Sequence, residues 1–343
     1  MNTLVPILIN TLPLNPRGDE SDVLVQAETV REAIKNLAYR TWVIEYPDRI
    51  KELEKLSGTD TPLSVFNLVE AVDDQNSLQY LAPQALERLK FPFTGNSSRA
   101  LRITTDKVLA KQIMVKNGIP TPRWTVLAAT GSSAPDGLRP VPRALIFKPV
   151  SEDASFGMRE DLIGTYGKHE ALEILDSLQK DSGMTYMAEE FVEGREFNLS
   201  LLEVSGAPCV LLPVEQDFSR LPAGYPHVVG YSAKWSDGSV PFGNIPRRHL
   251  FTAREERLLN ELRYLAIRCW YVFGLSGYAR VDFRVDKKGQ PFVLEINANP
   301  CLSPDAGFAY ASSLMGLSMT DLVCLILDAS LGKGRSGNLT AVS

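Results

Sequence analysis

The sequence predicts an α/β (α+β) protein of two or three packed domains, beginning with a small parallel sheet. The chain has 343 residues, of which 44% are hydrophobic and 22% charged. This length exceeds what one compact core usually holds, and the composition is that of a globular protein. The first hundred residues alternate strand-like and helix-like segments, which is typical of a parallel sheet built from βαβ units.

Within this first region, short apolar runs predict strands and amphipathic stretches predict the helices between them. The strands are expected at 5–9, 41–45 and 64–67, and the helices at 21–37, 48–56 and 78–89. Another helix is expected at 105–116, because Thr104 or Thr105 can cap its start and Gly118, followed by prolines, can end it.

The middle and the last third of the chain predict two further sheet regions. In the middle, strands are expected at 144–149 and 184–191, a polar loop at 151–157 and a helix at 169–179. The stretch 128–143 is rich in Ala, Gly, Ser and Pro, which indicates a surface loop inside the second domain. The last third is expected to hold strands at 195–204 and 210–214, helices at 253–273 and 308–315, and a frayed polar tail at 331–343.

The most informative motif lies near the C-terminus, where polar residues alternate on two successive strand patterns. Arg280 and Asp282 alternate on the first strand, and Glu295 and Asn297 on the second. Alternate residues on a strand point to one face, so pairing through a turn at 286–290 would gather the acids and the amide. Such oxygen ligands bind Mg²⁺ together with substrate phosphates, and a neighbouring arginine can stabilise developing negative charge. The alternative is a solvated hairpin face.

Three weaker features each have a purely structural alternative. Lys148 ends an apolar strand before a polar loop, which suits a phosphate site or a surface lysine. Glu189 and Glu196 bracket a strand–turn–strand junction, which suits a nucleotide base and ribose or a charged hairpin end. Ser303 or Asp305 can cap the helix that follows, whose N-terminus can bind an anion or simply be a capped end.

Charge and composition argue against several classes of function. The net charge is −5 without a basic patch, so nucleic acid is not expected as a partner. The apolar runs are too short to cross a bilayer, and the first one lacks the basic residues of a signal peptide. The four cysteines and three histidines are scattered, which favours a reduced, cytoplasmic protein and disfavours a zinc site or a Ser–His–Asp triad.

In this order and spacing, the motifs resemble the ATP-grasp ligases, and within them the D-alanine–D-alanine ligase-like group, over roughly residues 3–330. The resemblance implies three domains, with ATP held between the last two. These are an N-terminal Rossmann-like parallel-sheet domain at 1–104, a central ATP-grasp domain at 105–188 and a C-terminal ATP-grasp domain with the metal site at 189–330, followed by a flexible tail at 331–343. It also implies Mg²⁺ (two ions, with Mn²⁺ as a substitute), an acyl-phosphate intermediate and attack by an amine.

The resemblance also assigns roles to individual residues. The residues that match the family's magnesium ligands are Asp282, Glu295 and Asn297. Those that match its catalytic cations are Arg280, which stabilises the acyl phosphate and the tetrahedral intermediate, and Lys234, which reaches the γ-phosphate. The residues that match its other ATP contacts are Lys107 and Lys148 for the phosphates, Ser155 in the phosphate loop, Glu189 and the backbone of Val192 for adenine, and Glu196 for ribose.

The departures from the family pattern concern the substrate pocket. Ala154, Trp235 and Ala306 stand where D-alanine ligases carry serine, tyrosine and serine. The N-terminal glutamate that grips the first D-alanine has no clean match, with Asp22 or Glu20 lying nearest. The residues expected near the substrates are Asp22, Trp235, Ser303, Asp305, Ala306 and Gly307. Losing polar contacts of this kind changes specificity, so we expect intact catalytic machinery beside a rebuilt pocket.

These observations predict an ATP- and Mg²⁺-dependent ligase that forms a carbon–nitrogen bond. Its substrates are expected to be small molecules: an acceptor, phosphorylated on a carboxylate or enolised ketone oxygen, and a small amino acid. The acceptor named from overall similarity is mycosporine-glycine, joined to serine or threonine. The alternatives are a D-alanine–D-alanine ligase and a non-catalytic ATP-binding module. A homodimer is also expected.

Overall fold

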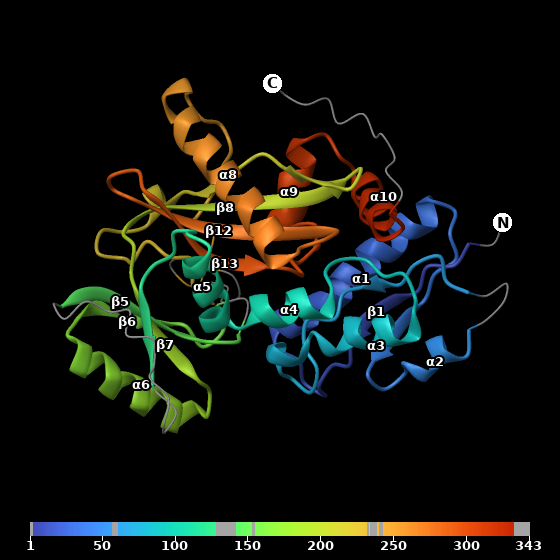
Figure 1. Cartoon of the computed structure of the whole chain (residues 1–343), viewed down its shortest axis with the longest axis horizontal. Helices are drawn as coiled ribbons and strands as arrows, with labels where there is room; N and C mark the ends of the chain where they lie inside the picture. The colour runs from blue at the N-terminus through green and yellow to red at the C-terminus, as the bar shows by residue number, and fades with distance from the viewer. Residues whose placement is uncertain are drawn as a thin grey trace.

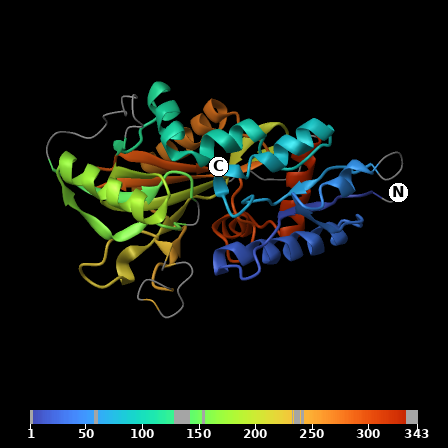
Figure 2. The ribbon, with the colours of Figure 1, turned by 90° about the horizontal axis from the view of Figure 1, so that it is seen from below.

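The computed structural model describes residues 3–56, 61–127, 142–152, 155–231, 233, 239 and 243–332. Figures 1 and 2 show an elongated arrangement, with the N-terminal sheet at one end, the central sheet at the other and a larger sheet between them. Ala154, Lys234, Trp235 and most of the expected tail lie outside the described residues.

The N-terminal sheet is parallel, as the alternation of strands and helices predicted. Its strand order is β2 (Val43–Tyr46), β1 (Ile7–Asn10), β3 (Phe66–Asn67). The helices are α1 (Gly18–Asn36), α2 (Lys51–Glu54) and α3 (Leu81–Leu89). Each lies within its expected segment to a few residues, although α2 is a single turn and shorter than expected.

The expected start of the helix at 105–116 is wrong. Two helices meet at Asp106: α4 (Ser98–Thr105) and α5 (Lys107–Lys116). The Asp106 carboxylate caps α5 by accepting the backbone N–H of Leu109 at 2.9 Å. The hydroxyls of Thr104 and Thr105 donate back into α4 instead, so neither threonine caps α5.

The central sheet is antiparallel, in the order β4 (Trp124–Val126), β7 (Tyr186–Glu190), β5 (Arg143–Pro149), β6 (Arg159–Tyr166). Helix α6 (Lys168–Ser182) packs on it through its own small apolar core (Figure 1). Strands β4 and β6 were not expected from the sequence. The expected domain division at 188/189 stays a prediction, and it falls inside β7.

The third sheet is antiparallel and carries the strands of the acidic motif. Its order is β11 (Arg247–Arg248), β10 (Val214–Gln216), β8 (Gly194–Val204), β12 (Tyr278–Asp286), β13 (Pro291–Asn297), with β9 (Ala207–Val210) also paired to β8. The strand expected at 210–214 is wrong, because those residues are divided between the end of β9 and the start of β10. Helix α8 (Glu256–Phe273) covers one face of this sheet.

The two ends of the chain share a hydrophobic core. Helices α9 (Gly307–Leu314) and α10 (Met319–Ser330) follow the third sheet, and α10 packs against α1 (Figures 1 and 2). The apolar residues in this contact include Val23, Val30, Ile34, Leu322, Val323 and Ile326. The first and third sheets therefore belong to one continuous body.

Among the described residues, none of the helices is by itself long and apolar enough to span a bilayer. Only α9 and α10 taken together reach that length and composition, and they are bent by 102° relative to each other.

Candidate active site

The expected hairpin of the acidic motif is present as β12 and β13. Asp282 lies opposite Glu295, and Arg280 lies opposite Asn297. The strands are joined by a tight turn in which Gly289 has a φ of +82°, a left-handed conformation that favours glycine. Alternation then separates the two faces, with the apolar residues of β12 packing toward α8 and the polar ones lining a cavity of about 830 Å³.

Asp282 is held by three neighbours at this face. The Arg280 guanidinium donates to both carboxylate oxygens, from Nε and Nη2, at 2.8 Å each. Asn198 on β8 and Asn297 on β13 donate their side-chain N–H groups to the same carboxylate at 2.7 and 3.0 Å. Burial works to lower the pKa of Arg280, but the neighbouring Asp282 carboxylate more than offsets this effect. The pKa of Arg280 is therefore raised, and the guanidinium stays a cation.

The donor set fits a metal that phosphates help to hold. Within the described part of the chain, no three His, Cys, Asp or Glu side chains gather as a closed metal site. Asp282 and Glu295 instead supply two carboxylates, and Asn297 supplies an amide, at the wall of an open cavity. Mg²⁺ is usually bound by one or two carboxylates plus phosphate oxygens, so these ligands suit it once a nucleotide is present.

Two lysines and a glutamate form a buried cluster, of which Lys148 and Glu189 line the same cavity. The Glu189 carboxylate lies 2.5 Å from Lys111 Nζ and 2.7 Å from Lys148 Nζ. Burial lowers the pKa of Lys111 to about 8, against the pull of Glu189. Burial also acts on Lys148, but Glu189 and Glu295 leave its pKa raised, so Lys148 stays charged.

Lys111 was not identified from the sequence. It lies four residues after Lys107, and residues spaced this way share one face of a helix. Lys107 lines the cavity, donates to the Glu152 carbonyl at 2.5 Å and lies 3.9 Å from Glu295. The spacing of the two lysines on α5 was the available signal.

The expected nucleotide-contact residues line the same cavity. Glu196 pairs with Arg284 at 3.1 Å, and the Val192 carbonyl accepts Arg284 Nε at 2.9 Å. Lys111 and Lys148 both contact the Glu189 carboxylate, so the expected contact of Glu189 with adenine stays a prediction. Arg284 also was not identified from the sequence; it follows Asp282 by two residues on the cavity face of β12.

Described residues after β5, among them Ser155 and Phe156, line the cavity. Ser155 has a φ of +64° and donates its hydroxyl to the Val229 carbonyl at 2.9 Å. The ring of Phe156 lies 4.2 Å from the Arg17 guanidinium and 6.0 Å, edge to face, from the ring of Tyr231. Segments from all three sheet regions therefore meet here.

At the other end of the cavity, Asp22 is engaged by the segment after β13. Its carboxylate accepts the Ser303 hydroxyl at 2.8 Å and the Cys301 thiol at 2.9 Å. The expected capping of the following helix is therefore wrong: Ala306 is the N-cap of α9, and neither the Ser303 nor the Asp305 side chain caps this helix. Burial, with the nearby acids Glu70 and Asp22, raises the pKa of Cys301, so the thiol is a hydrogen-bond donor and not a nucleophile.

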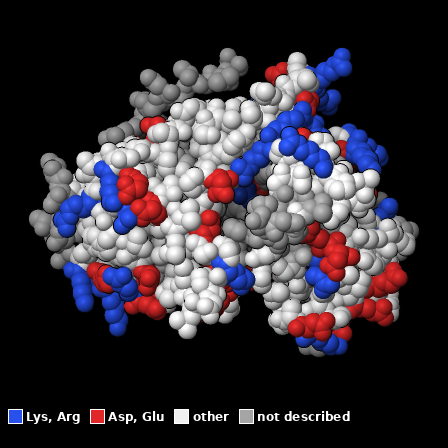
Figure 3. Space-filling view, turned by 180° about the vertical axis from the view of Figure 1, so that it is seen from behind, with Lys and Arg blue, Asp and Glu red and all other residues white. Residues whose placement is uncertain are grey.

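Charged groups from three regions line this end. Glu20, Asp22 and Glu70 come from the N-terminal region, and Arg247, Arg280 and Asp305 from the third sheet and the loop that follows it. The sequence reasoning missed Glu70, which accepts a hydrogen bond from Gln26 at 2.8 Å, and Arg247. Viewed from behind, acidic and basic side chains face each other around a hollow near the centre of the molecule (Figure 3).

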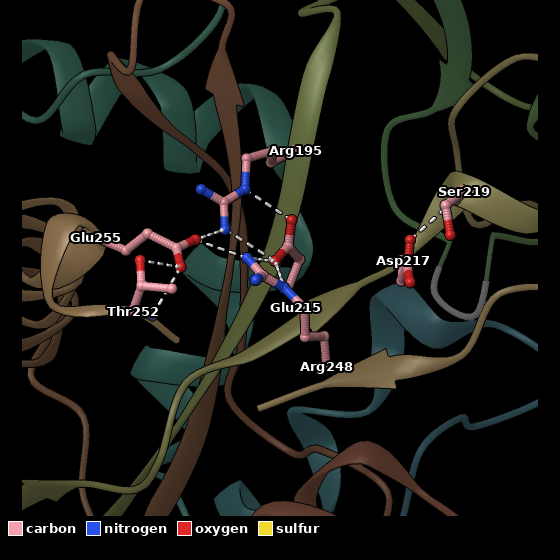
Figure 4. Close-up of polar contacts among 7 residues, drawn as sticks. All are labelled: Arg195, Glu215, Asp217, Ser219, Arg248, Thr252 and Glu255. Carbon is pink, nitrogen blue, oxygen red and sulfur yellow. Dashed lines mark hydrogen bonds and ion pairs between the residues drawn. The ribbon is translucent and has the colours of Figure 1, made fainter. Parts of the chain in front are cut away.

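A four-charge network lies on the opposite face of the third sheet (Figure 4). Arg195 and Arg248 each contact both Glu215 and Glu255, at 2.6 to 2.7 Å. Because Arg248 belongs to the short edge strand β11, the network fastens that strand to β10 and to the start of α8. It thereby fixes the neighbouring residue, Arg247, at the cavity.

We expect this network to make the protein sensitive to acid. Burial works to raise the pKa of Glu255, but the Thr252 N–H, Arg248 and Arg195 lower it from 4.5 to about 2. A carboxylate with a lowered pKa stabilises the fold above its unfolded value and loses this contribution as the pH falls from 4.5 toward 2. In Glu255→Gln, the urea midpoint should be lower at pH 7 and should fall less between pH 7 and pH 3 than in the wild type. The exposed Glu256→Gln serves as control, and equal pH dependence in Glu255→Gln and wild type would contradict the assignment.

Comparisons with known proteins agree with one another. A family model described as D-ala D-ala ligase C-terminus matches residues 113–328. The uncharacterized protein y4sG of Sinorhizobium fredii is 30% identical over 317 residues, covering 89% of this chain and 87% of that protein. The D-alanine–D-alanine ligase of Aquifex aeolicus is 27% identical over 322 residues, covering 91% and 97%.

The solved structures show the same fold. The crystal structure of the D-alanine–D-alanine ligase from Bacillus anthracis complexed with ATP aligns with a TM-score of 0.71. The alignment covers 96% of this chain and 97% of that one, at 18% sequence identity.

Proposed function

Since this chain belongs to the D-alanine–D-alanine ligase family and has its ATP-grasp fold, we propose that it joins a small acceptor, phosphorylated on a carboxylate or enolised ketone oxygen, to the amine of a small amino acid. It is an ADP-forming ATP-grasp ligase that uses ATP and Mg²⁺. The observation that carries the proposal is the convergence of Arg280, Asp282, Glu295 and Asn297 with Lys107 and Lys148 in one cavity.

The cavity residues suit each part of this reaction. Lys107 and Lys148 are cations at the wall where phosphates would lie, and they reduce charge repulsion as the γ-phosphoryl group passes to the acceptor oxygen. When bound, Mg²⁺ would shield the same phosphates, with Asp282, Glu295 and Asn297 as its protein ligands. Arg280, held in place by Asp282, stabilises the oxyanion that forms when the amine attacks and phosphate leaves.

Two acceptors remain candidates. D-alanine is supported by the names of the relatives. A different acceptor, of which mycosporine-glycine is the one named from the sequence, is supported by Ala306, which has no hydroxyl to offer a substrate carboxylate, and by Asp22, whose carboxylate is already engaged. These two observations do not favour mycosporine-glycine over other acceptors. The expected homodimer and cytoplasmic location stay predictions.

A substrate panel tests this proposal. ADP release is measured with ATP, Mg²⁺ and both enantiomers of each standard amino acid, with and without mycosporine-glycine. Mass spectrometry identifies the product. We expect ADP release to depend on an amino acid, because the phosphorylated acceptor needs an amine to complete the reaction. D-alanyl-D-alanine from D-alanine alone would select the first acceptor, and a mycosporine conjugate the second. ATP binding without ADP release in any mixture would overturn the proposal in favour of a non-catalytic module.

A further inference from the structure

Arg247 is a cation of the cavity that the reaction described above does not use. It pairs with Gln216 in the two-residue strand β11, while its neighbour Arg248 pairs with Glu215. Adjacent residues on a strand point to opposite faces. Arg248 accordingly enters the ion network of Figure 4, and Arg247 lines the cavity.

The guanidinium of Arg247 is held in place by an aromatic ring, and its N–H groups stay available to a ligand. It lies 5.2 Å from the centre of the Tyr310 ring on α9, and the Tyr310 hydroxyl is 2.9 Å from His249 Nδ1, which fixes the ring. In the part of the chain that the structure describes, Arg247 makes no ion pair and no side-chain hydrogen bond. When a guanidinium stacks on an aromatic ring, its N–H groups point outward in the plane of the guanidinium, where a ligand can accept them.

The charges around Arg247 favour an incoming anion. Burial lowers the pKa of its guanidinium; Asp305 and Tyr310 act in the opposite direction, and Arg280 adds to the lowering. Asp305 forms no ion pair with it among the described residues, and Arg280 is already bonded to Asp282. A carboxylate placed at Arg247 would therefore supply the direct ion-pair partner that this guanidinium lacks among the described residues.

We propose that Arg247 is a specificity-determining residue that binds the carboxylate of the amine-donating amino acid. This inference rests on the proposed ligase function. The planar guanidinium matches a carboxylate through two parallel hydrogen bonds, which a lysine cannot reproduce. Ala306, at the start of α9, offers no hydroxyl for this task, and Asp305 provides an opposite charge nearby for the ammonium end of a zwitterion. The site then selects amino acids over simple amines, whose positive charge Arg247 repels.

The test compares Arg247→Met, Arg247→Lys and the exposed Arg257→Met in the full chain. The probes are glycine, D-alanine and D-serine, each paired with its carboxamide. Two readouts are used: ADP release with ATP and Mg²⁺, and saturation-transfer NMR binding with a non-hydrolysable ATP analogue. We expect Arg247→Met to raise the KM or Kd of the amino acids by about 10- to 100-fold and to abolish their preference over the carboxamides, because a charge-assisted pair is lost.

The KM for ATP should not change in Arg247→Met, since its guanidinium packs on Tyr310 and not on the phosphate-binding lysines. Arg247→Lys should restore part of the preference, and Arg257→Met should match the wild type. Equal amino-acid affinity in Arg247→Met and wild type, or equal loss of ATP and amino-acid affinity, would overturn the inference.

The readouts separate this inference from the proposed function. Amino-acid-dependent ADP release that is unaffected in Arg247→Met would leave the ligase standing and remove the role of Arg247. Arg247-dependent binding of amino acids without ADP release would support the role of Arg247 and contradict the ligase activity. If the wild type binds none of the three amino acids more tightly than its carboxamide, the role of Arg247 is refuted whatever the ligase activity with other substrates.

Discussion

Replacing Glu295 by alanine is expected to reduce ATP turnover by about 10²- to 10³-fold while leaving the fold intact. Glu295 lies opposite Asp282 at the cavity wall, and its side chain is 31% exposed. Its removal therefore opens no hydrophobic core. It takes away one of the two carboxylates available to Mg²⁺ and leaves the charge of the transferring phosphoryl group less well stabilised.

The measurement is the initial rate of ADP release at saturating ATP, with Mg²⁺ varied. Circular dichroism melting of the same samples checks the fold. The matched control is Glu261→Ala, which removes an exposed carboxylate from α8. Glu295→Gln should also raise the Mg²⁺ concentration needed for half-maximal rate. Near-full activity in Glu295→Ala would show that Glu295 holds no essential metal.

Replacing Glu189 by alanine is expected to destabilise the protein by about 3–5 kcal/mol, because removing one partner of a buried ionic cluster leaves uncompensated charge. Glu189 is 2% exposed and lies between Lys111 and Lys148. Both lysines are buried and would lose the carboxylate that keeps them charged. The central sheet should be affected first, since Glu189 and Lys148 belong to its strands β7 and β5.

Urea unfolding followed by circular dichroism measures this loss. Glu173→Ala on α6, where the carboxylate is 67% exposed, is the control and should change stability little. Adding Lys111→Met to Glu189→Ala should recover part of the loss, because it removes one of the two unpaired cations. A loss below about 1 kcal/mol in Glu189→Ala, the size of a surface pair, would contradict the buried-cluster interpretation.

The parts of the fold that the sequence predicted well are those that local chemistry determines. The β12–β13 hairpin could be predicted because Arg280, Asp282, Glu295 and Asn297 alternate around a turn closed at Gly289. That pattern specifies both the strands and their polar face. The parallel N-terminal sheet followed in the same way from its alternating elements.

The rest depends on contacts between residues far apart in the chain. Ser303 was expected to cap a helix, but Asp22, 281 positions away, accepts its hydroxyl instead. Lys111 reads as an ordinary helical lysine until β7 places Glu189 against it. Arg247 likewise is recognised as a binding residue only because Tyr310, on a different element, holds its guanidinium in place. Spacing along the sequence does not encode such pairs, so they required the structure.

The core shared by α1 and α10 has a consequence for how the chain folds as it is made. The apolar face of α1 leaves the ribosome before its partners on α10 are made, because Leu322 lies 299 positions after Val23 in the chain. At bacterial or eukaryotic elongation rates, this interval is on the order of tens of seconds. During that time the N-terminal sheet lacks part of its covering, and nascent or prematurely terminated chains expose an aggregation-prone surface that chaperones would be expected to occupy.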